Sequence, residues 1–309
     1  MEKKRSLGVC FMEGWLRLHG RLPLPCHHAM ARVIAWLLRD VLRYRTGVVM
    51  VNLARSFPQK SYEELQQISK RFYAHFARTF TEMVWFGACR GEKGRRRLRE
   101  SHLVEIENPE LLNQLYRESP QLMLLQAHTG NWELIGGIRE YSYGQPLELD
   151  PKAFAVAYAA LRSPLWDRIM ADNRTAPVAD LGFDGYVETH QILRYAVSRR
   201  GQKFCFTFIT DQYPYWANGR KAEVRFMHQP TVTMTGGAAL ASRMDMAVAY
   251  VRFSCREEGG YRLSFVPITL HAAQMSPEQI MERYYQLLEE DLQAQPWNYL
   301  WTHKRWKEQ

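Results

Sequence analysis

Residues 122–133 constrain the fold more than any other part of the chain. They begin with the apolar run Leu-Met-Leu-Leu, which predicts a buried strand. A Thr-Gly-Asn turn follows, and these are residues of turns and helix caps. An apolar pattern at helical spacing then predicts a helix over 131–141. A buried strand that leads through a short turn into a helix is typical of α/β proteins.

Strand and helix patterns alternate through the rest of the chain. Strands are predicted at 103–107, 121–127, 153–159, 203–210, 222–227, 247–254 and 261–267. Helices are predicted at 108–117, 131–141, 162–174, 185–199, 232–244 and 276–294. Alternation of this kind predicts an α/β sheet with helices on both faces.

The first hundred residues have a different pattern. Residues 7–43 are amphipathic and carry tryptophan with flanking arginines, and a second helical pattern runs from a capping box at Ser61 and Glu64 to about Phe86. We therefore predict an N-terminal helical region over 1–100 and an α/β domain over 101–309. The amphipathic pattern fits two alternatives equally: a helix in a membrane interface, or an ordinary helix that faces the core.

Composition narrows the class of partner. The net charge of +9 suits an acidic partner, such as nucleic acid, an anionic membrane surface, a phosphorylated lipid or an acidic carrier protein. Five cysteines without CxxC spacing argue against a disulfide framework and a zinc site. Because no run of about 18 apolar residues occurs, we expect no spanning helix. The basic run over 90–99 fits either a solvated helix face or a contact with headgroups or an acidic carrier.

His128 and Glu133 are the first candidate catalytic pair. Five residues along an unbroken helix would turn two side chains about 140° apart, so they can meet only if the chain turns between them. Gly130 permits such a turn. A carboxylate that holds a histidine gives a neutral imidazole able to take a proton from a hydroxyl. The same two residues also fit a glutamate that stabilises a helix N-terminus and an ordinary hydrogen-bonded histidine.

The residues around this pair also limit the type of reaction. Neither serine nor cysteine occurs in it, which favours direct attack by a substrate hydroxyl over a covalent enzyme intermediate.

Asp211 and Gln212 directly follow the predicted strand 203–210. Ligands of open α/β sheets bind beyond the carboxyl ends of the strands, so we expect Asp211 and His128 to share a site. The alternative for Asp211 is a turn or cap residue. Arg174 ends a helical segment and suits a substrate phosphate; its alternative is surface solubility.

Taken in order, these residues resemble the late (secondary) acyltransferases of lipid A biosynthesis, of the lauroyl and myristoyl transferase type. The His-x-Gly-Asn-Trp-Glu element and a C-terminal Trp-x-His-x-Arg element are the specific ones. The matching features are Tyr44-Arg45, Asn52-Leu53, Ser56-Phe57-Pro58, Ala127-His128-x-Gly130-Asn131-Trp132-Glu133, Arg174, Asp211-Gln212, Gly237 with Ala239-Leu240-Ala241, and Tyr299-x-Trp301-x-His303-x-Arg305-Trp306-Lys307.

This resemblance implies a fold similar to that of the glycerol-phosphate acyltransferases, a mixed sheet flanked by helices. It implies transfer of a fatty acyl chain from acyl carrier protein to a hydroxyl of a lipid A precursor. The enzyme would lie on the cytoplasmic face of the Gram-negative inner membrane, bound to the phospholipid surface, and would need no metal or other cofactor and no nucleic acid.

The resemblance also implies roles for individual residues. His128 and Glu133 would be catalytic, with Glu133 fixing the imidazole tautomer. Asn131, Arg174, Asp211 and Gln212 would bind substrate. Independently of the resemblance, we expect the amides of the turn at 130–131 to stabilise the oxyanion, because helix N-termini offer free N–H groups.

Two departures from the family pattern matter. The N-terminal segment is interrupted by Arg and Asp where many members have a purely apolar anchor, which favours interfacial binding. Tyr-Pro-Tyr-Trp follows Gln212 where members often have Asp or Gly, which leaves the detailed role of Asp211 open.

Other functions remain open at this stage. An acyltransferase of the same fold could act on another aminolipid or glycolipid. A non-catalytic basic protein could bind membranes or nucleic acid. A metal hydrolase could use His128, Glu133, Asp211 and His228.

Overall fold

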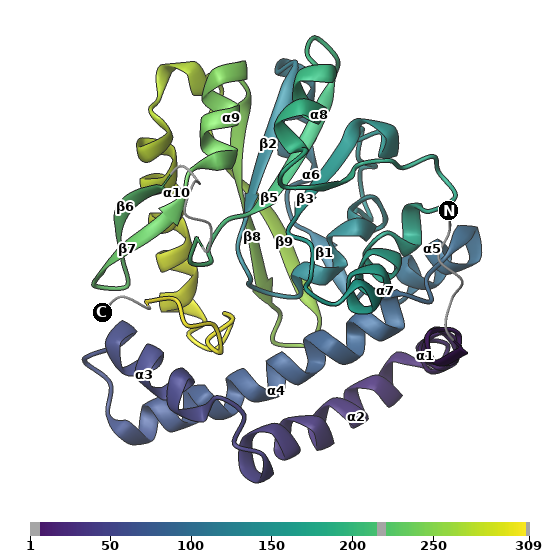
Figure 1. The fold of residues 1–309 in the computed structure, drawn as a ribbon, viewed down its shortest axis with the longest axis vertical. Helices are drawn as coiled ribbons and strands as arrows, with labels where there is room; N and C mark the ends of the chain where they lie inside the picture. Colours follow the sequence, from purple (N-terminus) through teal and green to yellow (C-terminus); the bar gives the residue numbers. More distant parts are fainter. Residues whose placement is uncertain (1–6, 215–220, 307–309) are drawn as a thin grey trace.

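The fold is built on a seven-stranded mixed sheet (Figure 1). The computed structural model describes residues 7–214 and 221–306, so predictions that fall on 1–6, 215–220 and 307–309, Lys307 among them, lie outside the described residues. Across the sheet the strand order is β1-β9-β8-β2-β5-β3-β4. The strands are β1 (Val104–Ile106), β2 (Gln121–Gln126), β3 (Phe154–Tyr158), β4 (Tyr186–Glu188), β5 (Phe204–Ile209), β8 (Ala247–Cys255) and β9 (Tyr261–Thr269).

All neighbouring strands of this sheet are parallel except β8 and β9, which pair antiparallel. The carboxyl ends of β2, β3, β5 and β8 therefore lie at one edge. β2 occupies the centre, and its alternate residues pack into different clusters: Met123 and Leu125 on one face of the sheet, Leu122 and Leu124 on the other. Burial on both faces explains why this strand is a continuous apolar run.

The predicted mixed α/β fold is confirmed, but two of the predicted helical ranges begin with a strand. The range 185–199, predicted as helix, begins with the short edge strand β4, and α8 (Ile192–Ser198) starts only after it. The range 232–244 begins within β7 (Gln229–Met234), which pairs with β6 (Lys221–Phe226) in a separate two-stranded hairpin. β4 has only three residues, and β7 lies outside the main sheet, so neither strand has a clear apolar pattern in the sequence.

Helices cover both faces of the sheet. The helices after β1 are α6 (Pro109–Glu118), α7 (Pro164–Arg174), α8, α9 (Gly236–Met244) and α10 (Pro277–Ala294), with short 3-10 helices η2 (Trp132–Glu140), η3 (Pro151–Ala153), η4 (Ala176–Val178) and η5 (Ala272–Gln274). The helix predicted over 131–141 is thus the tighter 3-10 form. It directs the side chains that follow His128 differently from an α-helix.

From residue 7 on, five α-helices precede the first strand: α1 (Leu7–Gly20), α2 (Leu24–Trp36), α3 (Thr46–Ser56), α4 (Tyr62–Phe86) and α5 (Gly91–Glu100). The π-helical turn η1 (Leu37–Val41) follows α2. The long α4 runs beneath the sheet, with α2 alongside it (Figure 1). The predicted capping box is confirmed, because Ser61 accepts from the Glu64 amide at 3.3 Å and the Glu64 carboxylate accepts from the Ser61 amide at 2.7 Å.

The outer face of α1 and α2 is apolar and exposed. In α2 only His27 and Ala31 are buried, whereas Val33 is 63% and Trp36 is 57% exposed. An ordinary helix facing the core would bury such side chains, so this observation favours the interfacial alternative. Within the described ranges, no helix is both long and apolar enough to cross a membrane.

The basic run in α5 is largely occupied by internal contacts. Arg95 pairs with Asp180 at 2.5 Å and lies near Glu92. Arg97 donates to the carbonyl oxygens of Gly20 and Leu22, and so holds the end of α1 against the domain. Neither predicted alternative, a solvated helix face or a contact with headgroups or an acidic carrier, describes Arg95 and Arg97, because internal contacts hold both side chains.

Candidate active site

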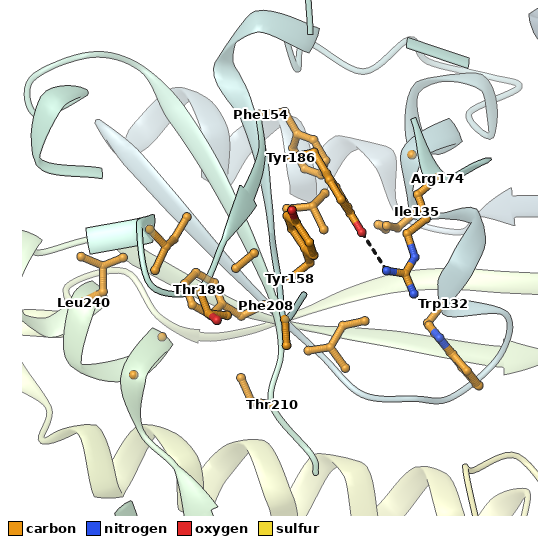
Figure 2. Close-up of a pocket in the computed structure, with 18 of the residues that line it drawn as sticks. Trp132, Ile135, Phe154, Tyr158, Arg174, Tyr186, Thr189, Phe208, Thr210 and Leu240 are labelled. Carbon is orange, nitrogen blue, oxygen red and sulfur yellow. Dashed lines mark hydrogen bonds between the residues drawn. The ribbon is translucent and has the colours of Figure 1, made fainter. Parts of the chain in front are cut away.

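A large cavity opens beside the carboxyl ends of the central strands. Its volume is about 1210 Å³, and its walls come from β3, β5, η2, α7, α8 and α9. Figure 2 shows Leu240 of α9 and Arg174 of α7 on opposite sides of the cavity, with Tyr158 and Phe208 between them. The lining is mainly aliphatic and aromatic and includes Ile135, Phe154, Val156, Phe183, Ile192 and Leu193. Such a cavity suits a long apolar ligand.

His128 lies on the cavity wall and is held by Asp211. Its Nδ1 lies 2.7 Å from Oδ1 of Asp211, and its backbone amide donates to the same oxygen at 3.2 Å. The two residues follow β2 and β5, which are parallel neighbours with Gln126 opposite Ile209. The strand register therefore brings together residues that are 83 positions apart.

This contact determines the tautomer of the imidazole. A carboxylate can only accept, so Nδ1 carries the proton and Nε2 keeps its lone pair. The side-chain amide of Gln212 donates to that Nε2 at 3.1 Å. Gln212 also lines the cavity, so the basic nitrogen and an amide donor lie together beside it.

Asp211 is ionised in this setting. The side chain is only 1% exposed, and burial alone would raise its pKa. The charge and hydrogen bond of His128 outweigh burial and hold the pKa below its usual value. A permanently charged carboxylate behind the ring can stabilise an imidazolium when one forms.

Glu133, the residue predicted to hold His128, instead binds Arg174. Its two oxygens accept from Nε and Nη2 of Arg174 at 2.5 and 2.7 Å. The indole N–H of Trp132 donates to the same carboxylate at 2.9 Å. Burial alone would lower the pKa of Arg174, but the charge of Glu133 raises it well above the usual value.

The 3-10 turn explains the difference from the prediction. The Trp132 ring packs edge-on against the His128 ring, with centroids 4.9 Å apart, while Glu133 turns toward the end of α7. Arg174 lines the cavity but is already paired, since its third nitrogen donates to the Tyr186 hydroxyl at 2.8 Å (Figure 2). The expected phosphate contact of Arg174 stays a prediction.

Asn131 is not among the residues that line the cavity. It is fully buried, and its amide donates to the Glu82 carboxylate at 2.9 Å. Glu82, in α4, also accepts from the Tyr261 hydroxyl at 2.6 Å and pairs with His28 at 2.9 Å. Asn131 thus connects the loop after His128 to α4, and its predicted contact with substrate stays a prediction.

The Gly130 amide, expected to stabilise an oxyanion, is also occupied: it donates to Oδ1 of Asn298 at 2.6 Å. Gly130 itself has a φ of 57°, and a Cβ there would lie 2.5 Å from the Phe253 ring. A glycine is required on both counts. Glu82 and Asn298, which organise this loop, carry no local sequence signal that marks them out.

Comparison with known proteins identifies the family of the chain. The sequence pattern of the family described as bacterial lipid A biosynthesis acyltransferase matches residues 2–308. The chain belongs to this family. A search of curated proteins found no significant match. Membership establishes an acyltransferase of lipid A biosynthesis and implies a lipid A-type acceptor.

In this lipid A acyltransferase, the motifs at the two ends of the chain meet behind the site. The Asn52 amide donates to the backbone oxygens of Trp301 and His303, each at 2.9 Å. His303 in turn accepts from the Tyr213 amide at 3.2 Å, directly beside Gln212. The interleaved aromatic and basic residues near the C-terminus therefore support the active-site loop.

The metal-hydrolase alternative requires a cluster of metal-ligating side chains. Among the residues that the structure describes, no group of three or more His, Cys, Asp and Glu side chains could hold a metal ion. His228 lies in the turn of the β6–β7 hairpin, so the hydrolase alternative lacks its ligand set.

Proposed function

We propose that the protein moves a fatty acyl chain from an acyl carrier protein thioester to a hydroxyl of a lipid A precursor. The observation that carries this proposal is the unprotonated Nε2 of His128, next to the Gln212 amide at the wall of a large apolar cavity. The cavity suits an acyl chain, and the imidazole suits activation of a hydroxyl. Family membership supplies the acceptor class.

In the proposed reaction, Nε2 of His128 takes the proton of the acceptor hydroxyl as its oxygen attacks the thioester carbonyl. Asp211 stabilises the imidazolium that results, in the role predicted for Glu133. The tetrahedral intermediate then expels the carrier thiolate, which receives the proton from His128. The Gln212 amide, close to Nε2, is the proposed donor to the oxyanion.

This reaction proceeds without a covalent enzyme intermediate. No serine or cysteine occurs among the described residues that line the cavity, so no common acyl-enzyme nucleophile is in reach. Neither a metal nor another cofactor takes part in the proposal. Glu133 is proposed to hold Arg174 at the cavity wall, where the remaining exposed guanidinium surface can approach a phosphate.

The protein is proposed to act on the cytoplasmic face of the inner membrane, with α1 and α2 in the interface. Trp15, Leu18 and Val33 are exposed there, Arg17 and Arg32 lie on the same helices, and Arg21 lies in the turn between them. Apolar side chains flanked by arginines bind anionic phospholipid surfaces. A lipid acceptor would then diffuse in the bilayer to the enzyme.

Acyl transfer in detergent micelles tests the proposal. Purified protein receives acyl carrier thioesters of several chain lengths and an under-acylated lipid A, with His128→Ala alongside. We expect product from the wild type and a loss of about 10²–10⁴-fold in the variant. His128-dependent thioester loss without transfer to lipid A would indicate another acceptor. Equal activity in both proteins would overturn the catalytic role of His128.

A further inference from the structure

A surface beside the cavity carries exposed apolar residues together with unpaired arginines. We call it the α8–α9 surface and define it by Leu193, Arg194, Val197, Arg200, Arg243 and Met244. Leu193 is 49% and Val197 is 55% exposed. Part of this surface is a hollow of about 210 Å³, which shares Leu193, Leu240 and Arg243 with the main cavity. The α8–α9 surface therefore adjoins a mouth of the cavity.

The charges of this surface are not compensated internally. Arg194, Arg200 and Arg243 form no side-chain hydrogen bond or ion pair with any other residue in the described ranges. Their neighbour Arg199 behaves differently, since it pairs with Asp184 at 2.9 Å. Three free guanidinium groups around exposed leucine and valine make a positive rim with an apolar centre, which is a common form of protein interface.

We propose that the α8–α9 surface binds the acyl carrier protein. The acidic face of the carrier would lie on Arg194 and Arg200, and its phosphopantetheine arm would enter the cavity beside Arg243. The cavity is continuous from Arg243 to His128, so the arm can deliver the thioester to the imidazole. This inference rests on the proposed function, which supplies the donor.

The position of the surface favours a soluble partner over a bilayer. In Figure 1, α8 and α9 lie at the end of the sheet opposite to α1 and α2. A molecule bound to a membrane through α1 and α2 therefore leaves α8 and α9 toward the aqueous phase. Acyl carrier proteins are small, soluble and acidic, which complements an exposed cluster of arginines.

The test compares two donors that carry the same acyl chain. One is the acyl carrier protein thioester, and the other is acyl-pantetheine, which lacks the protein. The variant is Arg194→Glu/Arg200→Glu, and neither residue lines the main cavity. The matched control is Arg225→Glu, an exposed arginine of the β6–β7 hairpin without an ion pair among the described residues.

We expect the double variant to lose at least about tenfold in kcat/KM with the carrier donor at low salt, because opposed charges at an interface rim slow association. Its activity with acyl-pantetheine should equal that of the wild type. Added salt should narrow the difference, since screening weakens surface charges. The control should match the wild type with both donors.

Other results would overturn the assignment. Equal losses with both donors would place the effect inside the enzyme, and no loss with the carrier would remove the docking role. If the double variant lost binding to anionic vesicles but kept binding to the carrier, the surface would be a lipid contact. A direct binding measurement with the holo-carrier separates this inference from the proposed function. If the wild type bound the carrier through Arg194 and Arg200 but transferred no acyl chain to lipid A, the docking surface would be upheld and the proposed acceptor refuted.

Discussion

Oδ1 of Asp211 lies 2.7 Å from Nδ1 of His128 and also accepts the backbone amide of the same histidine. One carboxylate oxygen therefore fixes both the ring and the chain that carries it. Glu133, only five residues from His128, is bound to Arg174 instead. Asp211 therefore orients His128, and Glu133 holds Arg174.

Asp211→Asn should lower kcat by about 10²–10⁴-fold with a smaller effect on KM. An asparagine amide can donate to Nδ1 and so favours the wrong imidazole tautomer, and it cannot stabilise the imidazolium. Steady-state kinetics with a carrier thioester and a lipid A precursor measure the change. Glu133→Gln is the comparison, because it removes the other carboxylate of the motif. A wild-type kcat in Asp211→Asn, with a larger loss in Glu133→Gln, would return the orienting role to Glu133.

The ion pair of Glu133 and Arg174 should contribute to stability. The Glu133 side chain is 7% and that of Arg174 26% exposed, so removal of either leaves a largely buried charge. Each of Glu133→Gln and Arg174→Gln should cost about 3 kcal/mol in free energy of unfolding. The double variant should cost about 2 kcal/mol less than the sum of the two. Urea unfolding of the four proteins gives this coupling, and simple additivity would show that the pair is not energetically linked.

Asn52 should contribute to the stability of the fold, although it does not line the cavity. Its amide holds two backbone carbonyls of the C-terminal segment, and the residue is only 6% exposed. Asn52→Leu should cost about 2–4 kcal/mol, because two acceptors lose their donor. Gln66→Leu, an exposed amide on α4, is the control and should change the unfolding free energy by less than about 0.5 kcal/mol. An equal effect of both changes would mean that apolar substitution, rather than the lost contacts, causes the destabilisation.

These contacts also show what the sequence could predict. The central strands were predictable because burial on both faces of the sheet demands continuous apolar runs, as in β2. His128 and Asp211 could be assigned to one site because both directly follow parallel strands. The edge strand β4 has three residues, and so short a segment has no measurable period.

The partner of His128 could not be predicted in the same way. Separation along the chain favoured Glu133, but the choice depends on the register of β2 against β5 and on the 3-10 turn of η2. No sequence signal distinguishes Glu82, since a glutamate in a long helix is ordinarily solvated. Only the packing of α4 against the sheet shows that it is a buried acceptor for Asn131 and Tyr261.

His75 should make stability depend on pH between about 4 and 6.5. It is buried in α4, and burial lowers its pKa from 6.5 to about 4, although the charge of Glu82 partly opposes this. The folded protein therefore binds fewer protons than the unfolded chain in this range, so the free energy of unfolding falls as pH falls. The full loss from this group is on the order of 3 kcal/mol. The pKa of His27 is also lowered, chiefly by burial, so it contributes in the same direction.

His75→Phe tests this assignment, because phenylalanine keeps a ring against Tyr261 and cannot titrate. Urea unfolding at several pH values between about 5 and 7 should give a shallower decline in the variant than in the wild type. Asp211 and Glu82 do not interfere, since their lowered pKa values confine their contributions to the acid side of this window. The same measurement on His27→Phe gives the contribution of His27. The double variant should lose most of the decline in the free energy of unfolding at low pH. An unchanged slope in His75→Phe would mean that His75 takes up its proton as readily in the folded protein as in the unfolded chain.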